Sequence, residues 1–155
     1  MNKTFFLFIV LLGLSSSLFA QEAELILKEK GIVLTSPSSP VANYVNCVRV
    51  GNLLFLAGTG PLKADKTYIT GKVGRDLTIE EGYEAARLAA ISHLAVLKNE
   101  LGSLNKVKRI VKVTGMVNCG EDFTDQSKVI NGYSYFMVEI SGEKGKHARA
   151  SISLP

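Results

Sequence analysis

Arg149 is the residue whose type and position most favour chemistry. It stands in the strand-like run His147-Ala148-Arg149-Ala150-Ser151, where an aliphatic side chain would be expected. A guanidinium held on a strand presents two parallel N–H donors at a fixed spacing, which suits the two oxygens of a carboxylate. An inter-strand or inter-subunit salt bridge explains the same residue equally well, and the sequence alone leaves both interpretations open.

The other chemistry-bearing residues form no metal or cofactor motif. Cys47, Cys119, His93 and His147 are scattered and lack the close pairs that zinc sites usually show. The turn Gly58-Thr59-Gly60 lacks the third glycine and the helix start of a dinucleotide-binding loop. We therefore expect neither a metal nor an organic cofactor.

The histidine and cysteine residues have structural interpretations. His93 flanks the apolar stripe of a predicted helix, so we interpret it as a histidine with satisfied hydrogen bonds inside the fold. Cys47 and Cys119 each lie in or at the end of a predicted strand. They could pair with each other or remain buried free thiols, and both alternatives stay open.

The charge balance gives little support to a nucleic-acid partner. The 155 residues include 18 Lys and Arg against 14 Asp and Glu, a formal net charge of +4. Lys106, Lys108, Arg109 and Lys112 could touch a phosphate backbone, but no aromatic residues lie between them to stack on bases. A solvated strand face is the favoured interpretation of this segment.

Length and composition predict one folded domain behind an export signal. With 46% hydrophobic residues and two cysteines, the chain is neither disordered nor a disulfide-stapled mini-protein. Lys3, the apolar run from Phe5 to Leu14 and the small residue Ala20 predict a signal peptide over residues 1–20. A spanning helix needs roughly 20 apolar residues, which disfavours the alternative of an uncleaved anchor. We therefore expect an exported protein without a stable membrane anchor after processing.

The elements that must position Arg149 follow from periodicity and turn signals. Residues 21–42 contain a short helix over 22–31 and a loop rich in serine and proline. Residues 43–155 form the main domain, which begins with a hairpin of strands 45–50 and 53–57 around Gly51-Asn52.

Two helices and two further strands complete this domain. A capping box at Thr78–Glu81 and an apolar stripe ending at Gly102 predict a long helix. A strand over 107–117, a second helix that Asp122–Asp125 opens and Gly142 closes, and a strand over 148–154 follow. The order predicts an α+β fold, in which two helices pack on one face of a mixed sheet.

Several spaced motifs resemble the Rid family, also called YjgF and labelled endoribonuclease L-PSP. They are Pro40 to Val45, Val50 to Gly58 with Pro61, Gly71 to Gly74, Glu80 to Arg87, Asp122 to Asn131, and Arg149 after a loop of Gly, Lys and His. The resemblance runs from about residue 22 to the end and is to the chorismate-mutase-like branch. It implies a chorismate-mutase-like fold that assembles as a homotrimer with ligand clefts between subunits.

The resemblance also implies an activity and its residues. Family members hydrolyse reactive imines and enamines to 2-keto acids and ammonia, and the arginine at the position of Arg149 holds the substrate carboxylate. Gly58 matches a glycine that offers backbone contacts beside the imine, and Tyr44 and Asn131 match residues that line the cleft. Ser151 stands where deaminases often carry cysteine, and its hydroxyl could contact the attacking water.

One expected element has no counterpart in this sequence. Family deaminases usually orient the water with a glutamate on a further terminal strand, and the sequence ends at Pro155 before such a strand. The expected function is hydrolysis of imine or enamine acids by a deaminase of the 2-iminobutanoate or 2-iminopropanoate type. The alternative is a non-catalytic protein of the same fold that binds a small carboxylate.

Overall fold

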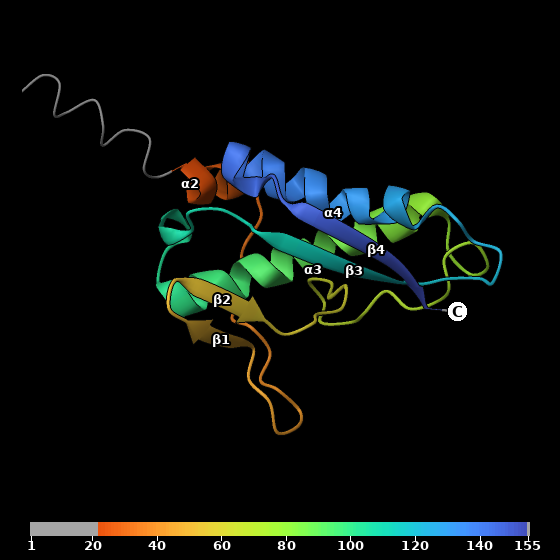
Figure 1. Cartoon of the computed structure of the whole chain (residues 1–155), viewed down its shortest axis with the longest axis horizontal. Coiled ribbons are helices and arrows are strands. Elements are labelled where there is room, and N and C mark those ends of the chain that lie inside the picture. Colours follow the sequence, from red (N-terminus) through yellow and green to blue (C-terminus); the bar gives the residue numbers. More distant parts are fainter. Residues whose placement is uncertain (1–21, 155) are drawn as a thin grey trace, which may run out of the picture.

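The computed structural model describes residues 22–154, and the predicted signal peptide lies outside this range. Figure 1 shows helices packed along two small pairs of strands. No helix within residues 22–154 is long and apolar enough to cross a membrane. The elements, in chain order, are α2 (Glu22–Glu29), β1 (Cys47–Val50), β2 (Leu53–Leu56), α3 (Ile79–Leu101), η1 (Leu104–Lys106), β3 (Lys112–Asn118), α4 (Gln126–Ser141), η2 (Gly142–Gly145) and β4 (Ala148–Leu154).

Helix α3 begins and ends where the sequence predicts. The Thr78 hydroxyl accepts a hydrogen bond from the Glu81 N–H at 3.1 Å, and the Glu81 carboxylate accepts the Thr78 N–H at 2.8 Å. This reciprocal pair satisfies two backbone donors that have no partner within the helix. At the other end, Gly102 adopts a left-handed φ of 77° and donates its N–H to the Lys98 carbonyl.

Helix α4 lies directly against α3 because Gly132 has no side chain. A Cβ at Gly132 would lie 2.0 Å from the Tyr83 carbonyl oxygen, closer than any real contact. At the same interface, the Arg87 guanidinium of α3 lies over the Phe136 ring of α4, 5.3 Å from its centroid. The backbones of the two helices therefore pack directly against each other at Gly132, and this contact fixes the position of α4 on α3.

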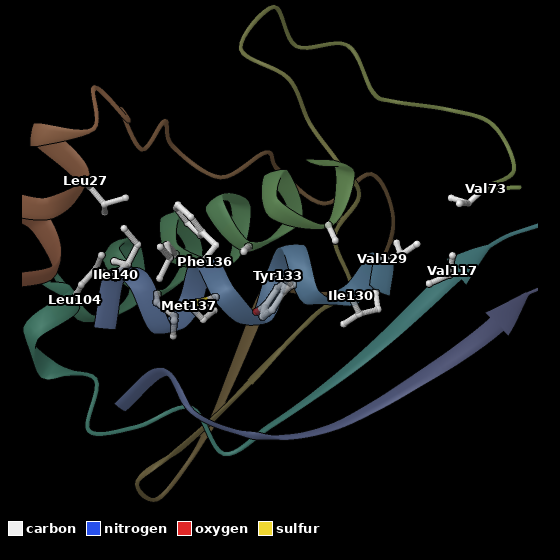
Figure 2. Close-up of a cluster of buried hydrophobic side chains, with 14 of the residues drawn as sticks. Leu27, Val73, Leu104, Val117, Val129, Ile130, Tyr133, Phe136, Met137 and Ile140 are labelled. Carbon is white, nitrogen blue, oxygen red and sulfur yellow. The ribbon is translucent and has the colours of Figure 1, made fainter. Parts of the chain in front are cut away.

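The hydrophobic core follows the length of α4. Figure 2 shows the labelled core side chains running from Leu27 and Leu104, past Tyr133, to Val73 and Val117. Met137 is fully buried in its centre. α2 covers one end of the same helix, where the Lys30 ammonium forms an ion pair with the Glu139 carboxylate. One side of α4 is thus committed to the core.

The strands pair as two small sheets. β1 and β2 form the predicted antiparallel hairpin around Gly51-Asn52, while β3 and β4 pair in parallel with α4 as their crossover. The fold is α+β, as predicted. Within residues 22–154, however, the hairpin and the β3–β4 pair share no strand pairing, so the mixed sheet is divided into two parts.

The strand predicted over 107–117 begins only at Lys112. The segment before it forms one backbone hydrogen bond with η2 and one with the first residue of β4. The Ile110 N–H donates to the Lys144 carbonyl at 2.7 Å, and the Ala148 N–H donates to the Val111 carbonyl at 3.1 Å. Val107 and Ile110, three residues apart, pack against the core, whereas Val111 is 58% exposed, so burial in this segment does not follow the alternation of a strand.

His93 joins the hairpin to both helices. Its Nε2 lies 3.0 Å from the Ala57 carbonyl oxygen, which can only accept, so Nε2 carries the proton. Its Nδ1 then accepts the hydroxyl of Tyr133 at 2.9 Å. Burial lowers the pKa of His93, which keeps the ring neutral. The interpretation of His93 as a structural histidine with satisfied hydrogen bonds is confirmed.

We expect Gly132→Ala to lower the free energy of unfolding by about 3 kcal/mol, because the new methyl group meets the Tyr83 backbone. Helix propensity alone would favour alanine by about 1 kcal/mol, so a lower free energy of unfolding must come from the steric clash. Urea denaturation measures the free energy of unfolding of both proteins. Gly120→Ala is the control, since its Cβ would have no neighbour nearer than 4.0 Å. Equal stability of the two variants would contradict close helix contact.

The partly buried His93 ring makes the stability of the protein depend on pH. Because the pKa of His93 is lower in the folded chain than the ordinary 6.5, the unfolded chain takes up the proton first as pH falls. The stabilising contribution is complete above about pH 6.5 and is lost below it. We expect the stability difference between wild type and His93→Gln to shrink between about pH 8 and pH 5. A difference that stays constant across this range would contradict the buried neutral ring.

Candidate functional site

Arg149 projects from β4 onto the N-terminal half of α4. Its Nη1 donates to the side-chain oxygen of Asn131 at 2.8 Å and lies 3.2 Å from the hydroxyl oxygen of Ser134. The two partners are three residues apart on the helix and therefore share one face. The structure thus brings together two of the residues that the sequence singles out, Arg149 and Asn131, and adds a third.

These bonds divide the guanidinium into an occupied and an open part. Nη1 carries two N–H groups, and Asn131 and Ser134 account for both. No residue between 22 and 154 accepts a hydrogen bond from the Nε or Nη2 of Arg149, and none forms a salt bridge with it. The Arg149 side chain is exposed. Its Nε–Nη2 edge can therefore accept a carboxylate in a two-point contact.

One further side chain, His147, extends this group, which we call the Arg149 cluster (Arg149, Asn131, Ser134 and His147). The Ser134 hydroxyl lies 3.1 Å from the Nε2 of His147. The Nδ1 of the same ring lies 2.6 Å from the Gly145 carbonyl oxygen. The His147 ring also packs edge-on against Tyr133 at 6.2 Å between centroids. Helix α4, η2 and β4 together build the cluster.

Neither Ser134 nor His147 is among the site residues that the sequence predicts. Two spacing signals could have found them. His147 precedes Arg149 by two residues, which places both on one face of an extended chain, and Ser134 follows Asn131 by one helical turn. What spacing could not show is that the helix face and the strand face meet, because that depends on how α4 crosses between β3 and β4.

The remaining candidate residues lie apart from the cluster's hydrogen bonds. Ser151 is half-buried on β4, two residues beyond Arg149 and so on the same strand face. Tyr44 lies before β1, with its side chain 51% exposed and without a hydrogen bond from the described residues. Gly58 follows β2 and lines a different hollow of the molecule. One copy of the chain does not gather all five predicted residues.

That hollow is a cavity of about 480 Å³ between the Gly58 turn, α3, α4 and β3. Its volume suits a small molecule, and its wall is mostly apolar. The partly buried polar pair at its wall, His93 and Tyr133, is already engaged in its own hydrogen bonds. Arg149 is not among the residues that line it.

The backbone of β3 borders this cavity. The Asn118 carbonyl accepts the Val73 N–H, whereas the Cys119 N–H bonds toward β4. The backbone N–H and C=O groups of a strand point alternately to its two sides. Those of Thr114 and Met116 therefore point away from β4, as those of Asn118 do, and no described strand pairs with them. The cavity thus offers an unpaired strand edge. The Arg149 cluster offers convergent polar side chains and is the better candidate for recognising a small polar ligand.

The cysteines are free thiols and do not pair with each other. Cys119 is fully buried, and burial raises the pKa of the half-buried Cys47 thiol. This decides between the two alternatives that the sequence left open. Among residues 22–154, no three His, Cys, Asp or Glu side chains gather in a way that could hold a metal ion.

The sequence and the fold are similar to those of known proteins. Residues 24–155 match the family model described as "YjgF/chorismate mutase-like, putative endoribonuclease". The chain is 37% identical to Protein TCP17 of Trypanosoma cruzi over 129 residues, which cover 83% of this chain and 81% of that protein.

Two solved structures show the same fold. The Agrobacterium tumefaciens protein Atu1372, of unknown function, is 39% identical with a TM-score of 0.78, covering 86% of this chain and 83% of that one. A "putative endoribonuclease" of Shewanella oneidensis is 32% identical with a TM-score of 0.83, covering 87% and 89%. The motifs, the fold and these matches agree, and the chain belongs to the YjgF/chorismate mutase-like family.

Proposed function

We propose that the protein hydrolyses reactive imine or enamine acids to 2-keto acids and ammonia. The observation that carries this proposal is the Arg149 guanidinium, whose Nη1 is held by Asn131 and Ser134 while its Nε–Nη2 edge stays open. An exposed arginine fixed by two neutral partners keeps its full charge for a ligand, and a carboxylate fits its open edge. Every 2-imino acid carries such a carboxylate next to the carbon that must react.

The reaction needs positioning and a water molecule. With the carboxylate on Arg149, the imine carbon is held at a fixed distance from β4. Water adds its oxygen to that carbon and a proton to the nitrogen, and the resulting carbinolamine loses ammonia as its C–N bond breaks and the C=O bond forms. Ser151 lies on the same strand face as Arg149, and we assign to its hydroxyl a hydrogen bond to that water. A serine hydroxyl alone is a weak base, so its role is to hold the water.

The family resemblance implies a site between subunits, and one exposed surface supports this part of the proposal. Val48, Val50, Leu53 and Phe55 lie on the same side of the hairpin and are 49–60% exposed. An apolar face of this kind marks an interaction surface. We include a homotrimer in the proposal, in which Tyr44 and Gly58 of a neighbouring copy complete the cleft beside Arg149. Export through the N-terminal segment is also part of the proposal.

The second candidate is a carboxylate-binding protein that performs no reaction. It is favoured by the composition of the cluster, in which no described Asp or Glu side chain contacts Arg149, Asn131, Ser134 or His147. Without an acid or base, the same open guanidinium edge would bind a 2-keto acid or another small carboxylate and release it unchanged.

Ammonia release separates the two candidates. We generate 2-iminobutanoate in place with an amino-acid oxidase and expect the protein to release ammonia faster than buffer alone. Arg149→Ala should lower kcat/KM at least about 100-fold, because two charge-assisted hydrogen bonds are lost. Arg149→Lys should recover little of this, since an ammonium lacks the fork.

Ser153→Ala is the matched control, since this exposed serine lies further along the same strand. Ammonia release no faster than in buffer would exclude the deaminase and leave the binding protein. Equal activity of wild type and Arg149→Ala would exclude Arg149 from the reaction.

The assembly is tested by the mass of the protein in solution. We expect sedimentation equilibrium to give three times the mass of one chain, and Phe55→Lys to shift the equilibrium toward smaller species, because a charge replaces an apolar contact. Tyr135→Lys is the control, as Tyr135 is 61% exposed on α4, away from the hairpin. A wild-type protein that sediments as a single chain would contradict an inter-subunit site.

A further inference from the structure

The hydrogen bonds of the Arg149 cluster run in one direction. The Gly145 carbonyl oxygen can only accept, so the Nδ1 of His147 carries a proton and donates at 2.6 Å. In this Nδ1–H tautomer Nε2 is the acceptor, and the Ser134 hydroxyl donates to it at 3.1 Å. The Ser134 oxygen in turn accepts from Arg149. Each donor and acceptor in this sequence has a single consistent role.

The direction matters for Ser134. A serine hydroxyl can turn freely, and a hydroxyl proton aimed at Arg149 would repel the guanidinium rather than accept from it. Because the Ser134 hydroxyl donates its proton in a hydrogen bond to the Nε2 of His147, the lone pairs of its oxygen face Nη1. The second N–H of Nη1 goes to Asn131. Through Ser134, the ring of His147 therefore keeps one N–H of Nη1 hydrogen-bonded, and the Nε–Nη2 edge stays open for the ligand.

The position of His147 is itself fixed by packing. Gly145 is buried, and a Cβ there would lie 2.2 Å from the Met137 carbonyl oxygen, so η2 lies directly on the backbone of α4. This contact holds the carbonyl that accepts from His147. The Tyr133 ring meets the His147 ring edge-on at 86° between their planes. The acceptor and the ring plane are thus both set before any ligand arrives.

We propose that His147 and Ser134 are positioning residues that hold Arg149 so that a substrate carboxylate binds side-on to its Nε–Nη2 edge. This inference rests on the proposed function, since it assigns how the carboxylate of that site is bound. Neither residue touches the ligand. Their effect is on the orientation of the guanidinium, and a guanidinium that can rotate loses part of its two-point contact.

The affinity for 2-oxobutanoate, measured by calorimetry, tests the proposal. We expect Ser134→Ala and His147→Leu each to raise the Kd about 10-fold, because the Nη1 contact is lost or misdirected. His147→Gln should stay within about twofold of wild type, since its amide supplies one acceptor and one donor. Ser153→Ala, on the same strand, should leave the Kd unchanged.

Nitrogen-15 NMR of the unmodified protein gives a second readout that needs no variant. The Nδ1–H tautomer of His147 is expected, and the Nε2–H tautomer would overturn the proposal. Unchanged affinity in both Ser134→Ala and His147→Leu, with binding lost in Arg149→Ala, would also overturn it while keeping the carboxylate site. Unchanged affinity in Arg149→Ala would overturn the site and this inference together.

Discussion

Gly132 lets α4 approach α3 until the Tyr83 carbonyl fills the place of a side chain, and the rest of the structure depends on this contact. α4 carries two sets of residues at once. One side packs Tyr133 and Met137 into the core, while Asn131 and Ser134 face β4. Because the same helix serves both, its seating on α3 also sets the distance from its polar face to Arg149. Core packing and ligand recognition are therefore not independent in this fold.

The strand that carries Arg149 is aligned by the same helix. β4 pairs in parallel with β3, and the crossover between them is α4 followed by the tight η2 turn. Gly145 brings that turn onto the α4 backbone, so the chain enters β4 with His147 beside Ser134. A helix, a turn and a strand that are adjacent in sequence thus form one rigid support. Rigid elements of this kind hold polar groups more accurately than loops do.

Local signals in the sequence predicted most of the fold. The capping box at Thr78 and the glycine at position 102 bound α3, and Gly51-Asn52 marks the hairpin, because each of these features acts through neighbouring residues. The segment over 107–111 was predicted as strand because its apolar residues suit one, but Val107 and Ile110 pack on the core while its backbone bonds once to η2 and once to the start of β4. Arg149 stands out by its residue type in a strand, and the family resemblance adds Asn131. Ser134 was not predicted, because its role depends on a contact between a helix and a strand that no local pattern reports.

The central claim is that the Nε–Nη2 edge of Arg149 is the carboxylate site and that its Nη1 is reserved for α4. A crystal structure of the protein with 2-oxobutanoate tests it most directly. We expect both carboxylate oxygens within hydrogen-bond distance of Nε and Nη2, about 2.7–2.9 Å, with Asn131 and Ser134 still on Nη1. A ligand carboxylate bound to Nη1 in place of those residues, or seated in the cavity beside Gly58 away from Arg149, would contradict the account.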